Sequence, residues 1–98
     1  MLRTKVQVKE AGYKYIGHYR TGGPFIALEN HAIGLSFSVG KFELLDLFNV
    51  FGVDCENGAY LNELQGRVCL VEIDDHGNAT KLVSVTNDKI TYSLKPNS

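Results

Sequence analysis

One amphipathic helix is the feature that most limits what this chain can fold into. Within residues 40–53, apolar side chains recur at the three- and four-residue spacing of a helical stripe. Ser38 is the expected N-cap. Gly52 is expected just beyond the last turn, because glycine adopts the left-handed conformation there at no steric cost. The stripe consists of Leu44, Leu47, Phe48 and Phe51, and it is widened by Phe42 and Leu45.

Short strands are expected on both sides of this helix. Alternating apolar and polar residues predict a hairpin of residues 2–10 and 13–20, with a turn at residues 11–12. The element order is then β-β-β-β-α-β-β-β, which favours an α+β domain whose strongly curved antiparallel sheet, OB-like or half-barrel, surrounds the helix. The seven expected strands are residues 2–10, 13–20, 25–29, 32–39, 67–73, 80–86 and 89–94.

Length and composition predict one small domain, residues 1–98. No apolar run approaches the roughly 18 residues that a membrane span needs. The first residues, 1–5, have no apolar core of a signal peptide. The two cysteines do not form the framework of a disulfide-rich protein. We therefore expect a reduced, cytoplasmic protein that does not enter a membrane.

A net charge of −1 conceals an uneven distribution along the chain. Residues 1–20 carry five Lys or Arg against one Glu, whereas residues 43–75 carry eight Asp or Glu against one Arg. The pattern is common for ordinary solvated faces, and it is also compatible with an acidic surface that binds a basic partner. The candidate residues of that acidic surface are Glu43, Asp46, Asp54, Glu56, Asp74 and Asp75.

The sequence offers no arrangement that predicts catalysis, a metal site or a cofactor. It lacks a G-x-S-x-G turn, and neither cysteine has a histidine nearby in the sequence. The acidic loop at residues 74–78 lacks the ligand pattern of an EF-hand. Gly22-Gly23 precedes a strand, so no helix N-terminus follows to bind a phosphate. We expect a protein that is not an enzyme.

A second candidate surface is the expected strand at residues 13–20, where aromatic and basic side chains alternate. Exposed aromatic rings beside cations can stack the bases of single-stranded nucleic acid. Tyrosines are also common in strands simply because they cover the rim of a sheet. The residues concerned are Tyr13, Lys14, Tyr15, Tyr19 and Arg20.

The order of motifs in residues 42–85 has a parallel in phage proteins. A helix ending at Gly52-Val53 is followed by Leu64-Gln65-Gly66-Arg67-Val68-Cys69-Leu70-Val71-Glu72, then by a turn at Gly77 and a strand. This order resembles small phage-encoded single-stranded-DNA-binding proteins of the OB type, which share the pattern L-x-G-x-x-C-x-V-E. The resemblance implies a phage or prophage origin. Many small acidic phage proteins inhibit host machinery, anti-CRISPR proteins among them.

These observations favour a non-catalytic binding protein that inhibits or redirects a host nucleic-acid-handling or defence complex. The expected partner is a larger host protein, or a protein–nucleic acid complex, with a basic surface. Residues 42–85 differ from the DNA-binding phage proteins in lacking a basic surface. The alternative is a module that binds single-stranded nucleic acid through the Tyr13–Arg20 strand, with an affinity that falls as salt rises.

Overall fold

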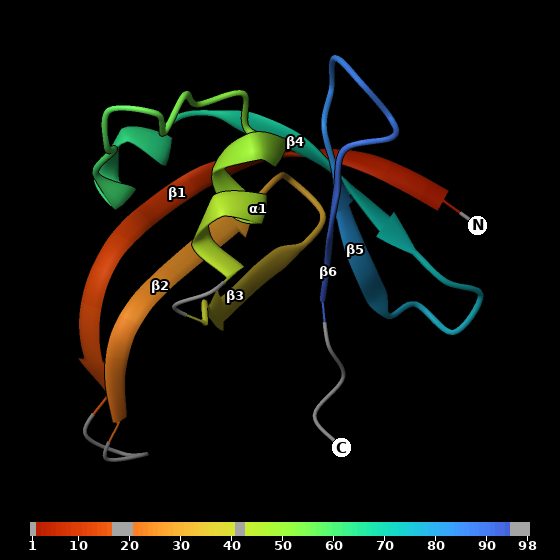
Figure 1. Cartoon of the computed structure of the whole chain (residues 1–98). Coiled ribbons are helices and arrows are strands. Elements are labelled where there is room, and N and C mark those ends of the chain that lie inside the picture. The colour runs from red at the N-terminus through yellow and green to blue at the C-terminus, as the bar shows by residue number, and fades with distance from the viewer. Residues whose placement is uncertain (1, 17–20, 41–42, 95–98) are drawn as a thin grey trace.

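A computed structural model describes residues 2–16, 21–40 and 43–94 (Figure 1), with the backbone alone described at residues 14–16 and 21–22. Within these residues, six strands form one antiparallel sheet in the order β3-β2-β1-β4-β5-β6. The sheet curls into a half-barrel, and the single α-helix lies in its hollow (Figure 1). The expected α+β class and the curved, OB-like architecture are confirmed.

The boundaries of the elements are as follows. The strands are β1 (Leu2–Ile16), β2 (Thr21–Glu29), β3 (Gly34–Ser38), β4 (Val68–Ile73), β5 (Ala79–Val83) and β6 (Thr91–Ser93). Between β3 and β4 lie the helix α1 (Leu44–Val50) and the 3₁₀ turn η2 (Leu61–Leu64).

The prediction of a hairpin about residues 11–12 is wrong, because β1 is one long bent strand. Its first part, Leu2–Gln7, pairs with β4, and its second part, Gln7–Ile16, pairs with β2. A register shift between Val8 and Glu10 marks the bend. One strand therefore replaces two, so the order becomes β-β-β-α-β-β-β and the sheet has six described strands instead of seven.

The two residues taken for a turn have a different role. Ala11 is 7% exposed and belongs to the hydrophobic core, opposite Ile26 of β2. Gly12 follows it inside the strand, opposite Phe25 of β2. Pairing with β2 therefore overrides the local preference of Ala-Gly for a turn.

The core fills the concave side of the sheet and the space beneath α1. From the sheet it takes inward-facing residues of β1, β2, β4, β5 and β6, including Val6, Ile26, Val71 and Leu82. From the helix it takes Leu47, Phe48 and Val50, each less than 9% exposed. The helical stripe predicted from the sequence is confirmed at Leu47, Phe48 and Phe51.

The two ends of α1 differ in how well the sequence predicts them. At the C-terminal end, Gly52 has φ of +72°, its N–H donates to Asn49 C=O, and Val53 N–H donates to Phe48 C=O. This is the expected glycine cap. At the other end the prediction is wrong, because Ser38 is the last residue of β3 and α1 begins only at Leu44.

Two residues expected to widen the apolar stripe give different outcomes. Leu45 is 58% exposed, so it faces solvent and not the core. Phe42 lies outside the described residues.

The half-barrel is left open between its outermost strands, β3 and β6. No ladder joins these strands in the described part of the sheet. Side chains bridge them instead: the rings of Phe37 and Tyr92 stack with their centroids 5.9 Å apart and their planes at 24°. We call this region the seam.

Candidate binding surfaces

Glu43 does not belong to a solvent-facing acidic surface, contrary to the prediction. It is half-buried just before α1, and its Oε2 accepts hydrogen bonds from Tyr92 Oη at 3.2 Å and Gly40 N–H at 3.3 Å. Burial, and then the charge and hydrogen bond of Glu43 and the charge of Asp46, raise the pKa of Tyr92 to about 12. Glu43 therefore joins the start of the helix to β6.

A different set of carboxylates is exposed on α1 and on the segment after it. Asp46, Asp54 and Glu56 are exposed, as predicted. Glu63, which was not predicted as a site residue, is exposed on η2. Burial, followed by the charges of Asp54 and Glu63, raises the pKa of the Cys55 thiol, so both carboxylates lie close to Cys55. We call Asp46, Asp54, Glu56 and Glu63 the acidic surface.

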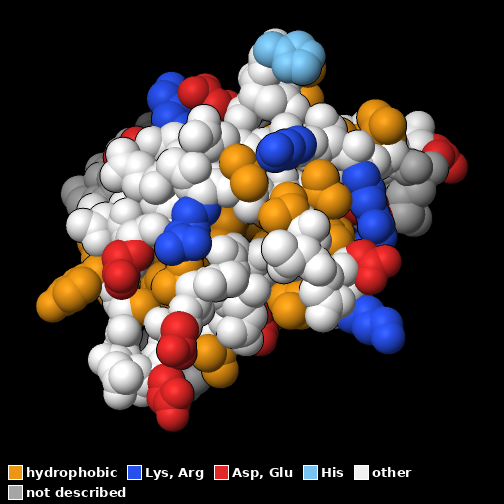
Figure 2. Space-filling view, turned by 90° about the horizontal axis from the view of Figure 1, so that it is seen from above, with side chains coloured by type: hydrophobic (Ala, Val, Ile, Leu, Met, Phe, Trp, Pro, Cys, Tyr) orange, Lys and Arg blue, Asp and Glu red, His pale blue; other side chains and the backbone are white. Residues whose placement is uncertain are grey.

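Local hydrogen bonds position this acidic surface. Asp54 Oδ1 accepts from Glu56 N–H at 2.9 Å, which folds the loop after α1. Glu63 Oε2 accepts from Tyr60 N–H and so fixes the start of η2. Figure 2 shows several acidic side chains at the lower left of its face and others at the top and right, with Lys and Arg side chains between them.

Asp74 and Asp75 lie elsewhere. They occupy the β4–β5 loop, which Figure 1 places on the opposite side of the molecule from η2. Asp74 Oδ1 accepts from His76 N–H and Asn78 N–H, both at 2.9 Å, so this carboxylate shapes the turn. Asp75 is exposed. The six predicted acidic residues therefore do not form one continuous surface.

Part of the sequence's charge asymmetry is cancelled when the strands pair. Glu72 of β4 stands opposite Arg3 of β1 and Lys81 of β5. Its side chain is only 4% exposed, with Arg3 Nε at 3.1 Å from Oε2 and Lys81 Nζ at 3.7 Å from Oε1. The acidic segment thus contributes its buried carboxylate to the basic N-terminal strand, which sequence spacing could not reveal.

The tyrosine strand is described only in part. Tyr13 lies on β1 opposite Pro24 and is 77% exposed. Lys14 and Tyr15 continue the strand and are described by their backbone alone, and Tyr19 and Arg20 lie outside the described residues. Tyr13 is therefore the one member of this set whose side chain the structure places.

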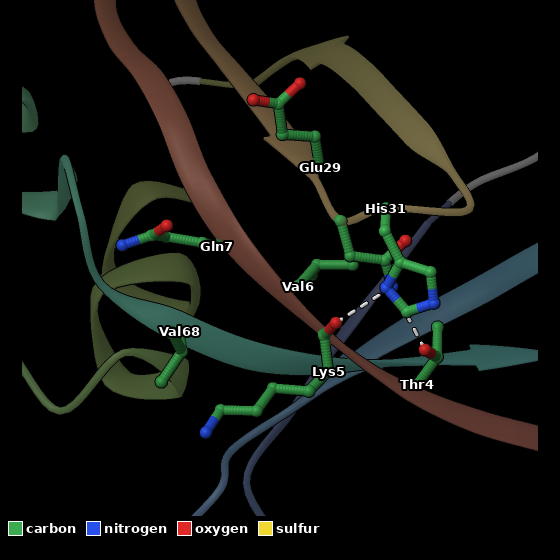
Figure 3. A pocket seen from close by; sticks show the side chains of 8 residues that line it. Thr4, Lys5, Val6, Gln7, Glu29, His31 and Val68 are labelled. Atoms are coloured by element: carbon green, nitrogen blue, oxygen red, sulfur yellow. Dashed lines mark hydrogen bonds between the residues drawn. The ribbon is translucent and has the colours of Figure 1, made fainter.

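A shallow depression of about 490 Å³ lies where β1 extends past the end of β2 (Figure 3). Asn30 dominates it: Nδ2 donates to Thr4 Oγ1 and Lys5 C=O, and Oδ1 accepts from two amides of the β2–β3 turn. The Lys5 and Glu29 side chains point to opposite sides of the depression in Figure 3. Its polar groups tie strands together and do not converge on a ligand.

Residues 2–16, 21–40 and 43–94 contain neither a metal-binding cluster nor a membrane-spanning helix. No group of three or more His, Cys, Asp or Glu side chains is placed to hold a metal ion in this part of the chain. None of the helices described there is long and apolar enough to cross a membrane. In comparisons with known proteins, no family model, curated protein or solved structure matches the chain significantly.

Proposed function

We propose that this protein is a non-catalytic binding protein whose acidic surface occupies a basic, nucleic-acid-binding surface of a larger partner and so inhibits or redirects it. The observation that carries the proposal is the exposure of Asp46, Asp54, Glu56 and Glu63 on α1, the loop after it and η2. The ion pairs found between described residues use Glu29 and Glu72 instead. The resemblance of residues 42–85 to phage proteins suggests that the partner is a host nucleic-acid-handling or defence complex.

Electrostatics gives this surface a clear physical role. Exposed carboxylates contribute little to the stability of the fold, but together they steer a positively charged partner toward one side of the molecule. They also compete with phosphates for the same lysines and arginines. Binding of this kind weakens as salt rises, because exposed charges are screened over about 8–10 Å at physiological ionic strength.

The test is capture of partners from a lysate of the host at low salt, with a variant and a matched control. Asp46→Lys with Glu56→Lys reverses two charges on the acidic surface and leaves the loop-forming Asp54 in place. Glu10→Lys with Asp88→Lys makes the same change in net charge at exposed positions elsewhere. We expect wild type and control to retain a basic protein partner, and the acidic-surface variant to lose it.

Two results would overturn the proposal. One is a folded Asp46→Lys, Glu56→Lys variant that retains the partner as well as wild type does. The other is the absence of any stoichiometric protein partner at low salt.

A second candidate function, binding of single-stranded nucleic acid, is favoured by one observation: Tyr13 is 77% exposed on the long strand of an OB-like half-barrel. A fluorescence titration with oligo-dT at about 50 mM salt tests it, because phosphate contacts are strong in that range. Tyr13→Ala should weaken any such binding. If wild type does not bind under these conditions, this candidate is rejected.

A further inference from the structure

Some strand edges of this sheet face solvent and have no neighbouring strand. Such an edge presents unpaired N–H and C=O groups that can pair with another strand, so folded proteins usually protect it. In the described part of this molecule, the edges with no neighbouring strand include the first part of β1 beyond the end of β2, the second part of β1 on the side away from β2, and the outer edges of β6 and β3.

Two of these edges are protected. On β1, Asn30 Nδ2 donates to Lys5 C=O at 2.9 Å, and the exposed side chains of Arg3 and Lys5 add positive charge (Figure 3). The β6 edge is short, since the strand spans only Thr91–Ser93. A covering side chain, charge and short length are the usual means of preventing edge pairing.

The β3 edge has none of these protections. Its sequence, Gly-Leu-Ser-Phe-Ser, contains no charged residue and no proline. Asn30 N–H donates to Ile33 C=O, and Val39 N–H donates to Pro24 C=O. These two bonds establish which residues of β3 direct their backbone groups toward β2. Because bonding alternates along a strand, the backbone groups of Gly34, Ser36 and Ser38 point away from β2.

The side chains of β3 fit the same interpretation. Gly34, Ser36 and Ser38 are small and exposed, so they place no bulk beside the edge. Leu35 and Phe37, which face the concave side, are only half-buried although they pack against the core. A strand added at this edge would pair the open backbone groups and cover the remaining apolar surface of both side chains.

We propose that the β3 edge is a strand-addition site, and that its occupant is β3 of a second copy of this chain. In an antiparallel arrangement with a two-fold axis at Ser36, Ser36 lies opposite its own copy and Gly34 lies opposite Ser38. Every outward backbone group then has a partner in this register. The uncharged edge repels no copy of itself, and Leu35 and Phe37 of the two molecules form one continuous apolar surface.

The seam leaves this edge accessible. The stack of Phe37 on Tyr92 is the ring contact that the structure shows between β3 and β6, and no ladder joins the two strands in the described residues. Little must therefore move for a second strand to pair with β3. The result is one sheet running through both molecules.

Charge at the symmetry axis provides the sharpest test. In the proposed register, Ser36→Lys and Ser36→Glu each place two like charges directly opposite one another, which is destabilising across a strand pair. Sedimentation should therefore show a dimer for wild type and a monomer for each variant. An equimolar mixture of the two variants should restore a dimer, because opposite charges then face each other. Thr91→Lys, at an exposed position on the β6 edge opposite the uncharged Val83, is the matched control and should remain dimeric.

Hydrogen exchange provides a second test that needs no variant. The amides of Gly34, Ser36 and Ser38 should exchange more slowly as the wild-type concentration rises, whereas the outward amide of Ser93 on β6 should not respond. The proposal is overturned if wild type remains monomeric at high concentration, if exchange at the three β3 amides is independent of concentration, or if Ser36→Lys is as dimeric as Thr91→Lys.

Discussion

The paired side of the half-barrel and its seam are built in different ways. Along β1, β4 and β5, backbone ladders run from strand to strand above a fully buried core, and the outer side carries the ion pairs of Glu72. At the seam, the structure shows one ring stack and the hydrogen bond from Tyr92 to Glu43. Stability on the paired side is shared among many groups, whereas the seam depends on a few side chains that one substitution can remove.

The largest loss of folding stability is expected where α1 packs on the core, which lies beneath both the paired side and the seam. Phe48 is 6% exposed, and Phe48→Ala leaves a cavity there, so we expect the free energy of unfolding to fall by about 3–5 kcal/mol. Urea denaturation measures this. Leu45→Ala, at a residue 58% exposed on the same helix, is the control and should change stability by less than about 0.5 kcal/mol. Similar losses for the two variants would contradict the inward orientation of Phe48.

A smaller loss is expected on the outer face of the paired side. Glu72→Gln removes the negative charge between Arg3 and Lys81, and losing a hydrogen-bonded buried charge costs about 1.5–3 kcal/mol. The comparison is Glu29→Gln, whose partner Lys9 is 3.7 Å away and where both side chains are more than half exposed. That substitution should cost no more than about 1 kcal/mol. Equal costs would show that burial of Glu72 adds nothing to its ion pairs.

Tyr92→Phe tests the seam, and its effect should depend on pH. At neutral pH, loss of the hydrogen bond to Glu43 should cost about 0.5–1.5 kcal/mol. The pKa of Tyr92 is raised from 10.0 to about 12, so between these values the unfolded state loses its proton first and is favoured. Stability of wild type should therefore decline as pH rises from 10 to 12.

The Tyr92→Phe variant has no phenol to titrate, so its stability should decline less between pH 10 and 12 than that of wild type. Burial also raises the pKa of Cys69 to about 12, but both proteins contain Cys69, so its contribution cancels in the difference between them. Denaturation series at several pH values provide the measurement. Parallel profiles for the two proteins would mean that Tyr92 titrates as it does in the unfolded chain.

The smallest effect on stability is expected at the acidic surface. Asp46→Lys and Glu56→Lys alter exposed side chains, so each should change the free energy of unfolding by less than about 0.5 kcal/mol. Thermal melts of the single variants check this. A large loss at either position would mean that the carboxylate supports the fold and that its substitution cannot report on binding.

The sequence predicted features that depend on near neighbours and failed where distant segments meet. The Gly52 cap and the inward face of Leu47 and Phe48 follow from residues within one or two turns, and both were predicted. The turn at residues 11–12 was wrong because pairing with β2 holds that segment extended, and the first part of the same strand pairs with β4, more than sixty residues away.

In the candidate site, too, features set by neighbouring residues were predicted and features set by distant residues were not. The exposure of Asp46 and Glu56 follows from their place on the polar face of a helix and in a loop. The half-burial of Glu43 could not be predicted, because its partner Tyr92 is 49 residues away in the sequence. Glu63 was missed because only the folding of the chain places its charge, like that of Asp54, where it acts on the Cys55 thiol.

The double pairing of β1 also determines the order in which the chain can fold. During synthesis, β1 can pair with β2 as soon as residue 29 has emerged, but its other edge must wait for β4 at residues 68–73. Contacts between segments so far apart form slowly, because the long intervening loop must close first. Until then a nascent sheet of β1, β2 and β3 exposes the apolar face of Val6 and Val8. The interval before β4 arrives is therefore when this chain is most prone to aggregate.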